Sequence, residues 1–252
     1  MQIVGRLFPF ERRFVTIHAT FGRCSRKLSM SKRSRILLPG YPHHVIQRGN
    51  NRRRLFSYSS DYRFFCECTR HGLAEHAVRL HAIALMSNHV HWIASFDDPA
   101  DFPKFVQRVS QRYAQYRNQT RDGSGKLFEQ RYLSFPILTE AQLAVTTAYI
   151  DLNPVRAGSV RDPVEYPWST AAIHMGQLER SKIPLALWTP SSWYAAMSDD
   201  AGKRCSEYVS WIEETRARDY APERVKQIEI IERLSALPYT RRLERPSRQR
   251  AA

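Results

Sequence analysis

Short apolar segments in the first part of the chain predict strands. One strand is expected around residues 44–47, within "PHHVIQRGNN", where "RGNN" is a turn signal. The mostly apolar stretch "LHAIALMSNHVHWIASF", residues 80–96, predicts one long strand or a pair of strands. A further strand is expected within residues 127–138, "LFEQRYLSFPIL".

Amphipathic helices are predicted between these strands. One begins near Ser60 or Asp61. A second covers residues 101–119, with apolar side chains at helical spacing: Phe102, Phe105, Val106, Val109, Tyr113 and Tyr116. A third begins at Thr139, with Gln142 as the partner in a capping box, and ends at "NPV" because a residue before proline avoids the helical region.

The order strand, helix, strand, helix, strand, helix has strands too short and helices too few for a doubly wound sheet. It predicts an α+β fold, a small antiparallel sheet with helices on one face and ferredoxin-like connectivity. We expect this domain at residues 30–176, followed by a helical C-terminal extension at residues 177–252 with an Arg-rich tail from Tyr239. Since Met30 looks like a natural start, residues 1–29 are expected to be a disordered or upstream extension.

The net charge of +15 on 252 residues says nothing about the fold, but it indicates the class of partner that the protein binds. Such an excess favours a polyanion, with nucleic acid first and an anionic membrane surface second. No apolar run approaches the roughly 18 residues of a membrane span. The four cysteines form no C-x-x-C pair, which favours reduced thiols in a cytoplasmic protein.

Two histidines interrupt the apolar stretch at residues 80–96. Because side chains alternate along a strand, His89 and His91 point to the same face and form half of a metal site. For an isolated H-x-H, satisfied core histidines are the competing interpretation, but Asn88 and the apolar flanks favour a functional pair. Ile93 occupies a position where a histidine-triad hydrolase needs a third histidine. A metal held by this pair and a third ligand from elsewhere remains, with open positions for a phosphate oxygen.

A second polar pair lies on the helix before "NPV". Tyr149 and Asn153 are four residues apart, so they are neighbours on one helix face and offer a nucleophile and a third metal ligand. The competing interpretation is a core aromatic residue and a polar helix end. Tyr113 and Tyr116 are rival nucleophiles, but both lie on an apolar stripe and are expected to be core residues.

Several ordered motifs carry a family resemblance. They are "LPGYPHHVIQRGNNRRRLF", "LHAIALMSNHVHWI", "GSGKLFEQRY", "AYIDLNPVRAGSV" and "EYPWST". Together they span roughly residues 33–175 and resemble the REP-associated tyrosine transposases, a branch of the HUH single-tyrosine, IS200-like transposases.

The resemblance implies a metal-dependent endonuclease and strand transferase that acts on single-stranded DNA, at hairpins formed by repetitive extragenic palindromes. It implies that His89, His91 and Asn153 bind Mg or Mn and that Tyr149 forms a 5′-phosphotyrosine while freeing a 3′-OH. It also implies a bacterial, cytoplasmic, nucleoid-associated protein, monomeric or homodimeric, with no membrane partner. The sequence departs from relatives at Asn153, where they have Gln, and at Phe128, where they favour Trp.

Basic side chains must hold the DNA in such an enzyme. The candidates are Arg48, Arg52, Arg53 and Arg54 after the first strand, and Arg108 and Arg112 on the long helix. A solvated face is the competing interpretation for each, and it is strongest for Arg108 and Arg112.

Two other functions compete with the transposase. A catalytically inactive nucleic-acid-binding regulator with the same fold would have no need of His89, His91 and Tyr149 together. A metal-dependent phosphohydrolase that uses water would need a general base, and no carboxylate is compelling for that role.

Overall fold

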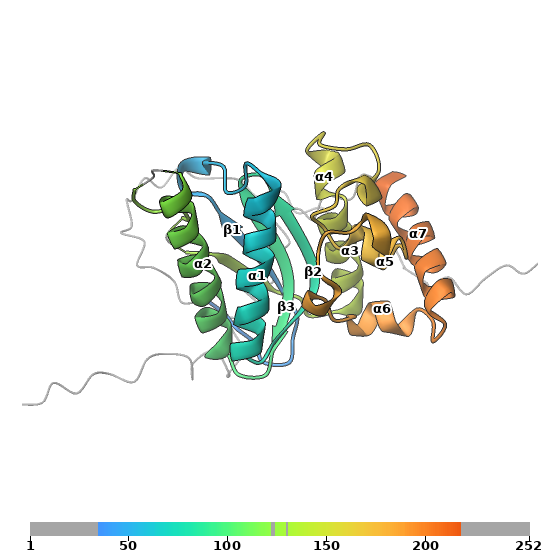
Figure 1. Cartoon of the computed structure of the whole chain (residues 1–252). Coiled ribbons are helices and arrows are strands. Elements are labelled where there is room, and N and C mark those ends of the chain that lie inside the picture. The colour runs from blue at the N-terminus through green and yellow to red at the C-terminus, as the bar shows by residue number, and fades with distance from the viewer. Residues whose placement is uncertain (1–34, 122–123, 130, 218–252) are drawn as a thin grey trace, which may run out of the picture. The chain divides into compact units, whose positions relative to one another are not determined.

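The computed structural model describes residues 35–121, 124–129 and 131–217 (Figure 1). The extension expected at residues 1–29, the part of the expected C-terminal extension after residue 217 and the Arg-rich tail lie outside these residues. The strands are β1 (His43–Arg48), β2 (Val78–Met86), β3 (His89–Phe96) and β4 (Leu133–Pro136). The stretch at residues 80–96 is therefore a pair of strands, and β4 covers only the later part of its predicted segment.

The strands form one antiparallel sheet in the order β2-β3-β1-β4. The helices α1 (Ser59–Glu75) and α2 (Asp101–Thr120) connect β1 to β2 and β3 to β4. This β-α-β-β-α-β order confirms the predicted α+β, ferredoxin-like fold.

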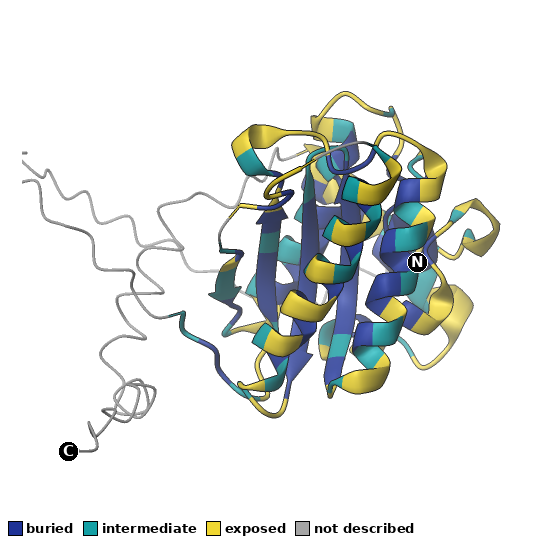
Figure 2. Cartoon of the chain, turned by 60° about the vertical axis from the view of Figure 1, so that its left-hand side comes forward, coloured by how far each residue is buried: buried dark blue, intermediate teal, exposed yellow. Residues whose placement is uncertain are grey.

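Both connecting helices cover the same face of the sheet, as Figure 1 shows. The indole of Trp92 on β3 packs between Phe65 of α1 and Phe105 of α2, with ring centroids 5.9 and 5.7 Å apart. Figure 2 shows β1, β2 and β3 as mostly buried and the outer sides of the helices as exposed. The main hydrophobic core therefore lies between the sheet and these two helices.

The opposite face is also covered, which the predicted arrangement with helices on one face did not include. Helix α3 (Glu140–Asp151) packs Leu143 and Ile150 against Ile93 and the small side chains of Ala82 and Ala84. Two alanines on β2 leave room for a helix to approach the sheet closely, and this explains the second layer.

The start of α3 follows the predicted cap with one change of partner. Thr139 accepts a hydrogen bond from the Gln142 backbone N–H through its side chain, at 3.1 Å. The Gln142 side chain reaches one residue further back and accepts from the Leu138 N–H at 2.8 Å. One backbone donor in the first turn of the helix and one just before the helix are thus satisfied, much as in a capping box.

Short elements follow α3 and pack around it. The helices are α4 (Asn153–Arg156), α5 (Ala171–His174), α6 (Ser192–Ala196) and α7 (Ala201–Ala217). The 3-10 turns are η1 (Asn50–Arg52), η2 (Pro163–Glu165), η3 (Leu178–Arg180) and η4 (Leu185–Leu187). Among the described residues, no helix is long and apolar enough to cross a membrane.

Candidate metal and tyrosine site

The two histidines of β3 point to the face of the sheet that α3 covers. They alternate with Val90 and Trp92, which belong to the core on the other face. The rings of His89 and His91 lie 4.8 Å apart between centroids. His91 is almost fully buried, while His89 is half-buried at the end of the strand.

The structure brings Tyr149 and Asn153 to this pair. The ring of Tyr149 meets the ring of His91 edge-on, with centroids 5.9 Å apart. The helix breaks at Leu152, and Asn153 begins the short α4. From there its amide nitrogen lies 3.1 Å from Nε2 of His91. Four side chains from two segments about 60 residues apart therefore converge on one point.

Burial keeps both histidines neutral. Burial, followed by the charge of Arg48, lowers the pKa of His89 to about 4. Burial, followed by the neighbouring His44 and His89, lowers the pKa of His91 well below its ordinary value. Neutral imidazoles keep the lone pair that a metal ligand needs.

These residues fit a divalent ion. Two ligand atoms about 2.1 Å from an octahedral ion and at right angles to each other lie about 3.0 Å apart. The separation of 3.1 Å between the Asn153 amide and His91 Nε2 matches this spacing, and a half-turn of the amide presents Oδ1 to the same point. In the described part of the chain, no cluster of three or more His, Cys, Asp or Glu offers a competing site.

Two neighbours of the pair contact its Nδ1 atoms. Nε2 of His44, on β1, lies 2.9 Å from Nδ1 of His91, and the two ring planes are inclined to each other by only 21°. Oδ1 of Asn88 lies 2.7 Å from Nδ1 of His89. The sequence prediction noted Asn88 without giving it a contact, and it missed His44. Period-two alternation along β1 gives the face of His44, but only the β1–β3 register gives its partner.

Arg156 is a further residue that the sequence prediction missed. Its guanidinium carbon lies 5.1 Å from the centroid of the Tyr149 ring. It stands at the end of α4, seven residues after Tyr149, in a segment that the sequence analysis uses as a helix end and as a family motif without giving Arg156 a role.

A buried polar network holds the helix that carries Tyr149. Asp151 is fully buried and accepts hydrogen bonds from Tyr208 Oη of α7 at 2.6 Å and from Thr170 Oγ1 at 3.1 Å. Nδ1 of His174 on α5 lies 2.6 Å from Oδ2 of Asp151, the same oxygen that Tyr208 contacts. The C-terminal helices are thus bound to α3 two residues beyond Tyr149.

The rival tyrosines lie in other surroundings. Tyr113 is fully buried in the main core and donates to the Leu55 carbonyl at 2.7 Å. Tyr116 stacks on Phe64, with centroids 4.1 Å apart. Both belong to α2, on the other face of the sheet from the histidines, as their apolar spacing predicts.

The predicted arginines fall into two groups. Arg48 is paired in register with His89, and its exposed side chain follows the histidine face of β1. Exposed residues 52–54 follow directly, and in the described part of the chain none of these four arginines forms an ion pair. In contrast, Arg108 pairs with Glu75 at 2.9 Å. It lies with Arg112 on α2, which covers the face of the sheet opposite the histidines.

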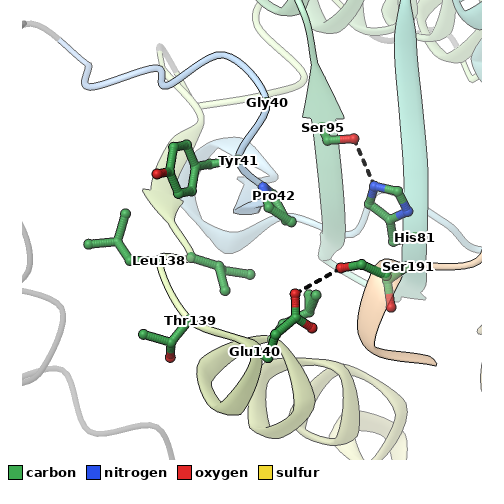
Figure 3. Close-up of a pocket in the computed structure, with 12 residues that line it drawn as sticks. Gly40, Tyr41, Pro42, His81, Ser95, Leu138, Thr139, Glu140 and Ser191 are labelled. Atoms are coloured by element: carbon green, nitrogen blue, oxygen red, sulfur yellow. Dashed lines mark hydrogen bonds between the residues drawn. The ribbon is translucent and has the colours of Figure 1, made fainter. Parts of the chain in front are cut away.

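A cavity of about 380 Å³ lies at the far end of the same face (Figure 3). His81 and Ser95 line it from neighbouring strands, and their side chains bond to each other at 2.8 Å. Glu140 at the start of α3 accepts from Ser192 at 2.9 Å. Because His81, Ser95 and Glu140 are already partnered and neither His89 nor His91 lines the cavity, we do not assign the chemistry to it.

The fold and the site define a class: a four-stranded antiparallel domain whose sheet presents two neutral histidines to a tyrosine-bearing helix. A family model described as "Transposase IS200 like" matches residues 40–153, which contain every one of these groups. The resemblance seen in the sequence is confirmed, because residues 40–153 match the model of the IS200-like transposase family.

A solved structure agrees on the fold. The structure of a REP-associated tyrosine transposase bound to a REP hairpin is 17% identical, with a TM-score of 0.51, and the match covers 64% of this chain and 93% of that one. A candidate transposase from Deinococcus radiodurans R1 is 15% identical with a TM-score of 0.34, over 46% of this chain and 93% of that one, and it adds no weight. No curated protein sequence matches this chain.

Proposed function

We propose that this transposase-family chain is a metal-dependent endonuclease and strand transferase for single-stranded DNA, acting at hairpins through a 5′-phosphotyrosine. The convergence of Tyr149 and Asn153 on the His89–His91 pair carries the proposal. A protein that only binds DNA gains nothing from a phenol placed beside two neutral imidazoles. The hairpin bound by the REP-associated relative supports the substrate class.

In this proposal, His89 and His91 hold Mg or Mn, with Asn153 as the third ligand. When bound, the ion supplies Lewis-acid polarisation of the scissile phosphate. Two imidazoles and an amide leave octahedral positions open for phosphate oxygens and water.

Tyr149 is the proposed nucleophile. Its Oη forms a bond to phosphorus, and the bond from phosphorus to the 3′ oxygen breaks. The phenol loses its proton, and the departing oxygen gains one to become a 3′-OH. Attack by a 3′-OH on the phosphotyrosine reverses these changes and restores the phenol, so rejoining needs no external energy source.

The positive charge next to the site would hold the DNA backbone. Arg48 borders His89, and residues 52–54 extend the charge from the end of β1. We assign phosphate contacts to this group, because none of its members forms an ion pair among the described residues. Arg108 and Arg112 are left out of the proposed interface, since they lie on the helix that covers the opposite face of the sheet.

Incubation of the full chain with hairpin oligonucleotides and Mn²⁺ tests the proposal. We expect a covalent protein–DNA adduct that survives a denaturing gel and disappears with Tyr149→Phe. Hairpin binding without adduct under any metal would instead support the inactive regulator.

A further inference from the structure

We propose that His44 is a positioning residue that fixes the tautomer of His91, so that His91 and His89 both bind metal through Nε2. This inference rests on the proposed metal site and names residues that support it. The ligands themselves are not at issue here. Asn88 has the matching role for His89.

The contacts of His91 determine where its proton lies. The amide N–H of Asn153 faces Nε2 of His91 at 3.1 Å, so Nε2 is the acceptor and carries the lone pair. The ring proton is then on Nδ1, which donates to Nε2 of His44 at 2.9 Å. His89 follows the same rule, because Oδ1 of Asn88 accepts from its Nδ1 at 2.7 Å. Each ring thus has Nδ1 engaged and Nε2 available.

The remaining nitrogen of His44 argues against a purely structural role. With Nε2 accepting, Nδ1 of His44 carries a proton, and it has no hydrogen-bond partner among the described residues although it is buried. A buried donor without a partner destabilises a fold. A phenylalanine would fill the same place beside Phe135 and Tyr149 without that penalty. A histidine at position 44 is therefore better explained by its hydrogen bond to His91 than by packing in the core.

Outer partners of this kind matter for metal binding. A ligating histidine whose other N–H is held by an acceptor has a fixed ring orientation and a more basic metal-binding nitrogen. Loss of such a partner lowers metal affinity by about 10–100-fold. Here the two acceptors come from different places, one from β1 and one from the β2–β3 turn, so they can be removed separately.

The test uses the full chain and measures Mn²⁺ affinity by calorimetry. We expect His44→Phe to weaken Mn²⁺ binding by about 10–100-fold while its melting temperature stays close to that of the wild type, because the variant removes one unpartnered buried donor, on His44, and leaves another, on His91. His44→Gln, whose amide oxygen reaches the position of Nε2, should restore most of the affinity. His43→Phe is the control: it removes a buried histidine from the same strand but on the opposite face, and should leave Mn²⁺ affinity unchanged.

A second readout reports the tautomer directly. Nitrogen-15 correlation spectra of the metal-free wild type should show His91 protonated at Nδ1, and the metal-free His44→Phe variant should shift that proton towards Nε2. If wild-type protein binds no Mn²⁺, the proposed metal site is wrong and this inference is wrong with it. If wild type binds Mn²⁺ and His44→Phe binds it as tightly with an unchanged tautomer, the metal site stands and the role of His44 is refuted.

Discussion

Removal of the Tyr208 hydroxyl should destabilise the protein and misplace Tyr149. Tyr208 is fully buried, and burial together with the carboxylate of Asp151 raises its pKa well above the ordinary value, so it remains a donor. Its bond to Asp151 is short, at 2.6 Å. A hydrogen bond to a charged group contributes about 1.5–3 kcal/mol, so Tyr208→Phe should lower the free energy of unfolding by about that amount.

Chemical denaturation followed by circular dichroism measures this loss. The midpoint should fall with little change in the slope, and the melting temperature should fall by about 3–12 °C for a chain of this size. Tyr113→Phe is the matched control, because it removes a buried phenol bonded to a neutral carbonyl on the other side of the sheet. The control should lose only about 0.5–1.5 kcal/mol.

The two variants should differ more in cleavage than in stability. Tyr208 holds α3 two residues beyond Tyr149, and a misplacement of about 1 Å near reacting atoms costs up to about 10²-fold in rate. Adduct formation should therefore slow in Tyr208→Phe and stay near wild type in Tyr113→Phe. Equal stability losses in the two variants would refute the charged network. A large stability loss with normal adduct formation would refute its positioning of Tyr149.

Three further predictions follow from the site and the charge distribution. Tyr149→Phe should abolish the covalent adduct on a denaturing gel while leaving hairpin affinity nearly unchanged, since only the phenol oxygen is lost; persistence of the adduct would mean another nucleophile. His91→Ala should eliminate Mn²⁺-dependent cleavage, and near-normal cleavage would make the histidine structural. Arg48→Gln should weaken hairpin binding and flatten its salt dependence by about 0.7 in log–log slope, whereas Arg108→Gln should change neither. A loss of binding in Arg108→Gln with normal binding in Arg48→Gln would place the interface on the other face of the sheet.

Much of the fold was accessible from the sequence because its signals are local. The helical spacing over residues 101–119 predicts α2 to within a residue, and Thr139 with Gln142 predicts the start of α3. The layer formed by α3 was not predicted, because its fit depends on Ala82 and Ala84 of a strand that lies more than fifty residues earlier. Alternation assigns residues to faces of a strand, but it does not say which helix covers each face.

Because sequence signals are local, some residues of the proposed site could not be predicted. The residues proposed for the site, His89 and His91, could be predicted from their spacing along one strand, and Tyr149 from its place on one helix. The contact between His44 and His91 spans 47 positions and depends on the antiparallel register of β1 and β3. Tyr208 and Asp151 are 57 positions apart and belong to elements with no shared periodicity. Buried polar partners across such distances leave no pattern in a single sequence.

The structure distinguishes basic side chains that composition cannot tell apart. The excess of +15 favours a polyanion but does not say where it binds. On the α1–α2 side, Arg117 and Arg121 hold the buried carboxylate of Asp61 at 3.2 and 2.9 Å, so these cations are committed to the fold. Burial alone would raise the pKa of Asp61, yet backbone N–H groups and Arg121 hold it below the ordinary value. The ion pairs of Asp61 therefore stabilise the fold at a pH above the pKa of an unfolded aspartate. Their contribution is lost as the pH falls through the lower pKa that Asp61 has in the folded protein. Arg48, next to His89, forms no such ion pair among the described residues, and its charge remains available for a phosphate at the site where Tyr149 would attack.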